Sequence, residues 1–111
     1  MRVLIKPFSE EYTEQCADLL QYLWKEEGSQ RLSHFKWEYL NNPNNNDVVT
    51  AIIALNEDGE VVGFRGYHVL QIYFGNKKER IAYMADTVVS PKARRQGIFQ
   101  RMTEYSLVYL K

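Results

Sequence analysis

The chain has 111 residues, of which 45% are hydrophobic and 25% are charged, and its formal net charge at pH 7 is +0. A chain of this size and apolar content forms one folded domain over residues 1–111 and is not of the disordered type. The zero net charge argues against a nucleic-acid-binding surface, and no apolar run approaches the roughly 20 residues that span a bilayer. The single cysteine, Cys16, excludes an intrachain disulfide framework and a cysteine metal cluster. We therefore expect a cytoplasmic protein that binds neither nucleic acid nor membrane.

The first part of the chain predicts one strand and two helices. Residues 2–6 form a short apolar run before a proline, which is typical of a strand. Ser9 is a suitable N-cap for a helix whose apolar side chains recur at helical spacing as far as Gly28. Its cysteine is expected to act as a small buried hydrophobe. A second helix is expected from about Leu32 to Leu40, followed by an asparagine-rich loop around Pro43.

The second part of the chain predicts an antiparallel meander followed by a helix. Apolar, β-branched runs alternate here with glycine-containing turns, and an Asp-Gly pair in the first turn favours a tight hairpin. The expected elements are strands at 48–55, 61–74 and 80–89, turns at 56–59 and 75–78, and a helix from about Gly97 to the last residue. The element order β-α-α-β-β-β-α indicates an α/β fold of the mixed α+β type.

The junction between the last strand and the last helix carries the strongest chemical signal. The strand ends in Val89-Ser90-Pro91, and a basic segment with Gly97 leads directly into the helix. A helix N-terminus presents unpaired N–H groups and a partial positive charge, which favour a phosphate or pyrophosphate. Taken alone, the same loop also fits a surface turn whose arginines are solvated.

This junction resembles the acetyl-coenzyme A loop of the GNAT N-acetyltransferase superfamily. The family pattern is Arg/Gln-x-x-Gly-x-Gly/Ala after a Val-x-Pro strand end, and residues 94–99 read Arg-Arg-Gln-Gly-Ile-Phe, with Phe99 in place of the usual small residue. The element order and the Trp37-x-Tyr39 motif, followed by Asn-Pro, are also similar to the family. The family continues with a further strand, a helix and usually two more strands. The resemblance therefore implies a GNAT-like fold whose C-terminal part is absent, so that a longer protein or a second copy in a homodimer completes the sheet.

The resemblance implies that acetyl-coenzyme A is the cosubstrate. Backbone N–H groups of the loop would bind its pyrophosphate, the arginines and Lys92 would add positive charge, and the preceding strand would contact the pantetheine arm. The implied cofactor-binding residues are Thr87, Val88, Val89, Arg94, Arg95, Gln96, Gly97, Ile98 and Phe99. No metal is expected.

Amine acetylation also needs a group that removes the ammonium proton. Asp86 is the catalytic candidate, because the resemblance implies that acidic residues on this strand serve that purpose in some members. A carboxylate paired with an arginine or capping a backbone group is the alternative role for Asp86, and a satisfied core residue is the alternative for His68. Tyr67 and Tyr83 are further candidates for the acceptor groove. The family's general-acid tyrosine has no counterpart here, and three aromatic residues are interpreted as core or groove wall: Trp24, Phe35 and Trp37.

Two functional hypotheses follow. The first is an acetyl-coenzyme A-dependent N-acetyltransferase that transfers the acetyl group directly to a primary amine of a small-molecule acceptor. The second is a non-catalytic GNAT-like module for ligand sensing or docking, such as one half of a tandem protein.

Overall fold

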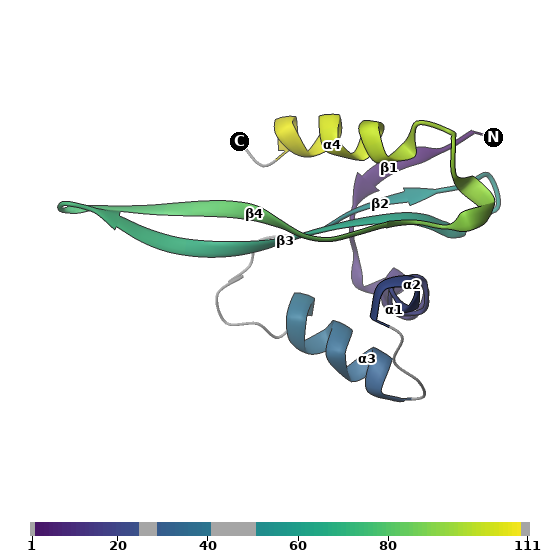
Figure 1. Cartoon of the computed structure of the whole chain (residues 1–111), viewed down its shortest axis with the longest axis horizontal. Helices are drawn as coiled ribbons and strands as arrows, with labels where there is room; N and C mark the ends of the chain where they lie inside the picture. Colours follow the sequence, from purple (N-terminus) through teal and green to yellow (C-terminus); the bar gives the residue numbers. More distant parts are fainter. Residues whose placement is uncertain (1, 25–28, 41–50, 110–111) are drawn as a thin grey trace.

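A four-stranded sheet organises the protein, and the computed structural model describes residues 2–24, 29–40 and 51–109. The strands lie in the order β1-β2-β3-β4, and every pairing between these described strands is antiparallel (Figure 1). Their bounds are Leu4–Pro7 for β1, Ala51–Leu55 for β2, Val61–Phe74 for β3 and Lys77–Val89 for β4. The predicted mixed α+β class and the central meander are therefore confirmed.

Helices cover both faces of this sheet (Figure 1). On one face lie α1 (Thr13–Leu19), α2 (Gln21–Trp24) and α3 (Ser29–Phe35), and on the other face lies α4 (Ile98–Tyr109). Three short turns complete the described elements: η1 (Glu10–Tyr12), the π-helical η2 (Lys36–Leu40) and η3 (Pro91–Ala93). Within the described residues, no helix is long and apolar enough to cross a membrane.

The helical prediction for the first part of the chain was right in type and wrong in detail. The single expected helix begins as η1 and is divided at Leu20 into α1 and α2. Ser9 makes no capping bond, because its hydroxyl instead donates to Oε1 of Glu11 at 3.1 Å. The second helix starts at Ser29 and ends in the π-helical turn η2. The expected stop at Gly28 and the asparagine-rich loop with Pro43 lie outside the described residues.

The strand predictions hold more closely. The bounds of β3 are those expected, whereas β4 begins at Lys77 rather than at Arg80. The turn between them is therefore tighter than predicted, and Gly75 allows it by adopting a φ of +59°. The first part of the strand expected at 48–55 lies outside the described residues.

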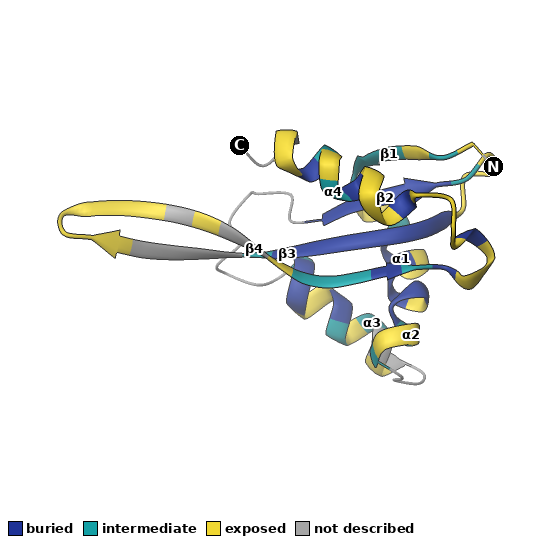
Figure 2. Cartoon of the chain, turned by 45° about the horizontal axis from the view of Figure 1, so that its top comes forward, coloured by how far each residue is buried: buried dark blue, intermediate teal, exposed yellow. Residues whose placement is uncertain are grey.

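Two hydrophobic layers hold the helices to the sheet, because side chains alternate along β2. Ile53 and Leu55 belong to the layer under α1 and α3, and Ile52 and Ala54 belong to the layer under α4. Figure 2 shows that β2 and the body of β3, at the centre of the sheet, are buried. Cys16 is fully buried in the first layer, as predicted, and burial raises the pKa of its thiol.

Beyond the body of the protein, β3 and β4 continue as a two-stranded arm. The pairing of β2 with β3 ends at Gly66, so the outer part of the hairpin has no third strand in the described sheet (Figure 1). Tyr73 and Phe74 near its tip are 70% and 65% exposed. The predicted cofactor residues of β4, Thr87 to Val89, lie in the body of the hairpin and not in this arm.

The layer under α4 provides a direct test of the fold. Met102 is fully buried, so we predict that Met102→Ala lowers the free energy of unfolding by about 2–5 kcal/mol. Leu107 lies on the same helix and is 69% exposed, so Leu107→Ala should stay within about 0.5 kcal/mol of the wild type. Denaturant unfolding of both variants measures the difference, and equal losses would contradict the placement of α4.

Candidate acyl-coenzyme A and acceptor site

The loop from β4 to α4 has an unusual backbone. Arg94 is extended, whereas Arg95 and Gly97 adopt positive φ values of 68° and 71°. Glycine reaches this region without penalty, but a left-handed arginine is strained. Strain of this kind is common at ligand-binding loops, where it fixes the direction of backbone N–H groups.

These N–H groups lie at the start of α4. The first helical bond runs from the N–H of Arg101 to the carbonyl of Gly97 at 3.0 Å, so the N–H groups of residues 98–100 come before the first helical bond. A Cβ placed on Gly97 would have no heavy atom within 4 Å, so the space in front of the loop is open. A cavity of about 200 Å³ lies here, lined by Val89, Ala93, Arg94, Arg95, Gly97, Ile98 and Phe99.

The structure brings most of the predicted cofactor residues to this cavity. Arg94, Arg95 and Gln96 are exposed, and the Arg94 Nε donates to the carbonyl of Val89 at 3.3 Å. Lys92 instead lies 3.0 Å from Glu60, a half-exposed pair that holds the loop against the turn before β3. The predicted cation cluster at the loop is therefore the arginine pair without Lys92.

The three predicted strand residues do not share one face. Val88 is buried in the layer under α1 and α3, whereas Val89 packs in the layer under α4. Thr87, which precedes both valines, is half-buried, and its Oγ1 is buried without a hydrogen-bond partner. Thr87 is therefore the one of these three residues whose side chain carries an unsatisfied polar atom.

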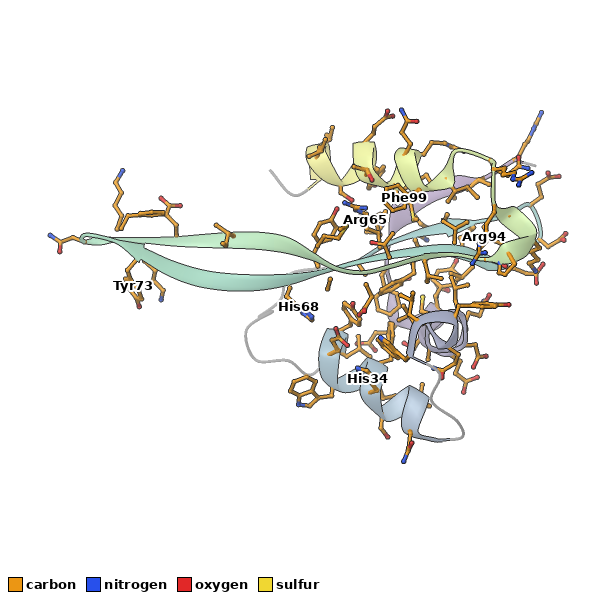
Figure 3. All side chains as sticks on the ribbon, in the orientation of Figure 1. His34, Arg65, His68, Tyr73, Arg94 and Phe99 are labelled. Atoms are coloured by element: carbon orange, nitrogen blue, oxygen red, sulfur yellow. The ribbon has the colours of Figure 1, made fainter. Side chains whose placement is uncertain are left out.

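A buried arginine that the sequence did not indicate lies opposite Thr87. Arg65 is only 8% exposed and pairs with Thr87 across the sheet. Its Nε donates to Oη of Tyr67 at 2.6 Å, and its guanidinium lies 5.3 Å from the ring centre of Phe99. Figure 3 shows Arg65 and Phe99 between the sheet and α4. Tyr67 therefore supports the side chain of Arg65.

A bulge in β4 separates the cofactor end of the strand from the arm. Arg65 pairs with Thr87 and Tyr67 pairs with Met84, so β4 holds one residue more than β3 between these pairs. Bulges of this kind re-aim side chains and are common beside active sites. Asp86 lies in this bulge and points towards the face covered by α1, α2 and α3.

Asp86 accepts hydrogen bonds from the layer that contains α1, α2, α3 and η2. This layer is called the helical layer, and the face of the sheet that it covers is called the helical face. Oη of Tyr39 donates to Oδ2 at 2.5 Å, and Nε1 of Trp24 donates to Oδ1 at 3.3 Å. Gly66 makes this possible, because a Cβ there would lie 2.6 Å from two ring carbons of Tyr39. As an alternative to a catalytic role, Asp86 was expected to pair with an arginine or to cap a backbone group. Its hydrogen-bond donors are instead a tyrosine and a tryptophan.

Glu38 forms the second half of an acidic pair with Asp86. It is 9% exposed and shares a hydrogen bond with Asp86. Its Oε2 lies 2.9 Å from Nε2 of His34, and its Oε1 lies 2.9 Å from Nε2 of His68. His68 is therefore a member of a polar cluster and not a satisfied core residue on an apolar face.

Each histidine of this cluster also stacks on an aromatic ring. His34 lies 3.7 Å from Trp24, and His68 lies 5.9 Å from Tyr39, centre to centre. Figure 3 shows both histidines on the helical side of the sheet, opposite Arg65 and Phe99. Glu38 and His34 were not singled out from the sequence, although their spacing by one helical turn was visible.

Burial raises the pKa values of two groups in this cluster, Glu38 and Tyr39. Desolvation raises the pKa of Glu38, and the hydrogen bond to Asp86 and its negative charge raise it further. The two histidines act in the opposite direction. Desolvation and the Asp86 bond also raise the pKa of Tyr39, so this phenol remains a donor.

The other aromatic predictions have mixed outcomes. Phe35 is fully buried, as expected, and Trp24 is half-buried in the site. Trp37 was expected in the core or the groove wall, but it is 64% exposed because it follows the π-helical turn onto the outer surface. The side chain of Tyr83 lies outside what the structure describes.

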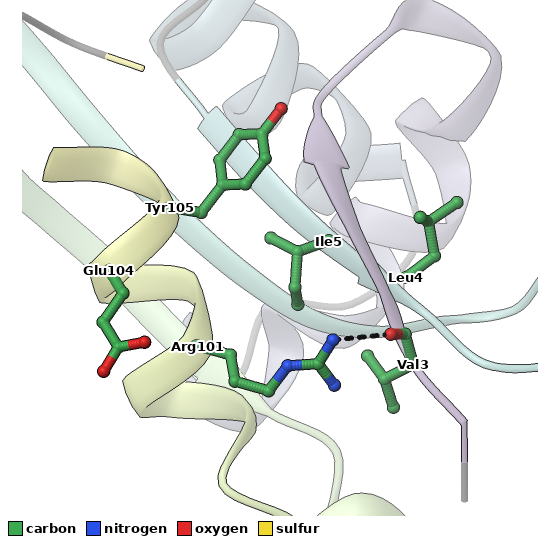
Figure 4. Close-up of a pocket in the computed structure, with 6 residues that line it drawn as sticks. All are labelled: Val3, Leu4, Ile5, Arg101, Glu104 and Tyr105. Carbon is green, nitrogen blue, oxygen red and sulfur yellow. Dashed lines mark hydrogen bonds between the residues drawn. The ribbon is translucent and has the colours of Figure 1, made fainter. Parts of the chain in front are cut away.

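A larger cavity lies away from this site. It has a volume of about 430 Å³ between β1 and α4, and its lining residues are Val3, Leu4, Ile5, Arg101, Glu104 and Tyr105 (Figure 4). One guanidinium N–H of Arg101 donates to the carbonyl of Val3 at 2.9 Å and bridges the two elements. None of the predicted site residues lines this cavity. Among the described residues, no group of three or more His, Cys, Asp or Glu side chains is arranged to hold a metal ion.

A family comparison identifies the fold that holds this site. The acetyltransferase (GNAT) domain family matches residues 4–111. The chain belongs to the GNAT acetyltransferase family. This confirms the resemblance drawn from residues 94–99 and from the element order. No curated protein matches the chain.

Solved GNAT structures share the fold at low sequence identity. An aminoglycoside antibiotic 6'-N-acetyltransferase from Acinetobacter baumannii is 15% identical, with a TM-score of 0.71 over 97% of this chain and 71% of its own. The structure of AAC(6')-Iy with the bisubstrate analog CoA-S-monomethyl-acetylneamine is 15% identical, with a TM-score of 0.71 over 98% and 71%. A probable N-acyltransferase from Enterococcus faecalis is 18% identical, with a TM-score of 0.79 over 99% of this chain and 26% of its own.

The packing of Tyr39 over Gly66 gives the first prediction for the site. Gly66→Ala should lower the free energy of unfolding by about 1–3 kcal/mol, because the new methyl group overlaps the tyrosine ring. In a Tyr39→Ala background the same substitution should cost clearly less, since the two residues are in contact. Denaturant unfolding of the four proteins tests this, and an equal cost in both backgrounds would show that the ring does not lie over Gly66.

The raised pKa of Glu38 gives the second prediction. Between the unfolded pKa near 4.5 and the higher folded pKa, the folded state holds one proton more than the unfolded state. Stability contributed by this proton is fully present below that window and is lost as the pH rises, at up to about 1.4 kcal/mol per pH unit. Glu38→Gln should remove this slope. The test is the difference in unfolding free energy between variant and wild type from acidic to neutral pH, and a constant difference would contradict the prediction.

Proposed function

We propose that the protein is an acetyl-coenzyme A-dependent N-acetyltransferase that acts on a primary amine of a small-molecule acceptor. The observation that carries this proposal is the loop at residues 94–99. It combines two positive φ values, an open space before Gly97 and the N-terminus of a 12-residue helix. These are the features that hold a pyrophosphate.

The described residues fit the cofactor. The N–H groups of residues 98–100 and the exposed guanidinium groups of Arg94 and Arg95 would hold the pyrophosphate. The unsatisfied Oγ1 of Thr87 and the outer edge of β4 would face the pantetheine arm, because β4 is at one end of the described sheet. Solved GNAT neighbours contain coenzyme A or its analogues, which agrees with this assignment.

When bound, acetyl-coenzyme A supplies the thioester from which the acetyl group is transferred. The chain offers no thiolate to carry that group in between, since its one cysteine is fully buried and burial raises the thiol pKa. Direct transfer to the amine is therefore the mechanism that the residues support. The protein holds the cosubstrate, orients the amine and removes its proton.

The acceptor side of the site is acidic. Asp86 and Glu38 lie on the helical face, at the bulge that precedes Thr87. A negative carboxylate at this position suits a substrate that arrives as an ammonium ion, and Asp86 is the group that we assign to accept its proton. Neighbours with the same fold are aminoglycoside acetyltransferases, which supports a small-molecule amine acceptor.

The direct test combines binding and turnover. Calorimetry with acetyl-coenzyme A should show binding, and a thiol-release assay should show transfer to at least one member of a panel of primary amines. The panel contains an alkylamine, a diamine, glucosamine, lysine and neamine. Binding without turnover on any amine would favour the non-catalytic ligand-sensing module, and the absence of both would reject the proposal.

The strained Arg95 allows binding to be separated from folding. Arg95→Gly keeps the positive φ and removes the guanidinium, so the free energy of unfolding should stay within about 1 kcal/mol of the wild type. The Kd for acetyl-coenzyme A should rise about tenfold, the usual effect of losing one charge-assisted hydrogen bond. Lys77→Gln removes the same charge from the far end of the hairpin and should leave the Kd unchanged. An unchanged Kd for Arg95→Gly would remove Arg95 from the site.

A further inference from the structure

We propose that Arg65, with Thr87 beside it, forms a subsite for a carboxylate at the end of the acyl chain, so that the site prefers the coenzyme A thioester of a dicarboxylic acid to acetyl-coenzyme A. This inference rests on the proposed acyltransferase function and names the class of acyl group that the same site takes. Acetyl-coenzyme A remains a substrate that lacks this one contact.

The charge of Arg65 is buried and has no counterion among the described residues. Arg65 is 8% exposed, and none of the ion pairs within that part of the chain includes it. Its Nε donates to Oη of Tyr67, whereas its Nη1 is buried and has no hydrogen-bond partner. Arginine is rarely buried unless it is paired, and its fork of N–H groups matches the two oxygens of a carboxylate. A carboxylate would therefore satisfy both the charge and Nη1.

Thr87 adds a hydroxyl group to the same place. It pairs with Arg65 across β3 and β4, so the two side chains stand next to each other on the face that α4 covers. Its Oγ1 is also buried without a hydrogen-bond partner. Buried polar atoms in folded proteins are nearly always hydrogen-bonded, so two unsatisfied ones on adjacent side chains indicate a site for a polar group of a ligand.

Phe99 controls access to the guanidinium group of Arg65. The centre of its ring lies 5.3 Å from the guanidinium carbon, as Figure 3 allows the reader to follow. Phe99 also lines the cavity at the loop and is 53% exposed. The buried contacts of the first turns of α4 are made by Ile98 and Met102 instead. The ring of Phe99 can therefore turn outward without disturbing them, and the subsite then opens into the cofactor cavity.

The position along β4 matches the acyl end of the cosubstrate and not its phosphates. The pyrophosphate is assigned to the loop at residues 94–99, which follows the end of β4. Thr87 comes directly after Asp86, the group assigned to accept the proton of the amine, and these two neighbours point to opposite faces of the sheet. The reacting carbonyl must lie near Asp86, so an acyl chain that continues on the other face meets Arg65.

The transfer itself is that of the proposed function. The ammonium nitrogen loses two protons, one to Asp86 and one to the leaving sulfur. A bond forms from this nitrogen to the acyl carbon, and the bond from that carbon to sulfur breaks. The carboxylate at the far end of the chain takes no part in the reaction and remains on the product, which is an amide with one more negative charge than the acetylated amine.

Calorimetry with two stable thioethers tests the subsite without turnover. The thioether analogue of succinyl-coenzyme A carries the carboxylate, and the analogue of butyryl-coenzyme A has a methyl group in its place. The wild type should bind the carboxylate analogue at least about tenfold more tightly, the usual contribution of a charge-assisted hydrogen bond. Arg65→Met should abolish this preference and leave the Kd for the butyryl analogue close to that of the wild type.

Three further variants serve as controls. Arg2→Met makes the same change at an exposed position and should keep the full preference. Arg65→Lys keeps the charge without the fork of N–H groups and should keep part of it. If the Arg65 variants do not fold, Phe99→Ala provides the test, because removal of the ring uncovers the guanidinium group and should increase the preference for the carboxylate analogue.

The proposed function and this inference fail in different ways. If the wild type binds neither thioether and transfers no acetyl group to any amine of the panel, the proposed function is wrong. If the wild type transfers acetyl but binds the two thioethers equally, the carboxylate subsite alone is wrong. The same conclusion follows if Arg65→Met weakens both thioethers alike, or if Phe99→Ala leaves the preference unchanged.

Discussion

The hydrogen bond from Tyr39 to Asp86 is the contact on which the arrangement of the site depends. It joins the helical layer to β4, the strand that continues into the loop at residues 94–99. It forms across Gly66, whose missing side chain leaves room for the tyrosine ring. Together with the bond from Trp24 to Asp86 and the contact of His68 with Glu38, it holds the helical layer against β3 and β4. A buried phenol thus helps to set the distance between the two halves of the proposed reaction.

The two faces of the sheet have different chemistry because the bulge in β4 changes which residues point to which side. On the face of α4, Thr87 and Arg65 are paired across the strands, and Phe99 lies over the guanidinium. On the helical face, Asp86 meets Glu38, with histidines on either side. Asp86 and Thr87 are neighbours and point to opposite faces, as in any strand. The extra residue instead brings Met84 and Thr87, which are three positions apart, to the same face, opposite Tyr67 and Arg65.

The backbone of the loop at residues 94–99 could be predicted from the sequence, because its features are local. Six consecutive residues, 94–99, form a strand-to-helix turn, and a left-handed glycine and a helix N-terminus can both be inferred from spacing. The acceptor half is not local. Tyr39 and Asp86 are 47 positions apart, and nothing in the pattern indicates that they touch. The same reason explains why Arg65 was missed, because its position opposite Thr87 depends on the register between β3 and β4.

The position of the acidic pair also bears on substrate choice. Burial and the nearby Asp86 raise the pKa of Glu38 and favour its protonated form, which lessens the repulsion of two full charges in a poorly solvated place. The two carboxyl groups have different neighbours. Tyr39 and Trp24 donate to Asp86, while the histidines lie beside Glu38 and are more exposed. Under the proposed function, these carboxyl groups lie beside the strand that leads to the loop at residues 94–99, and they favour an acceptor that arrives as an ammonium ion over a neutral one.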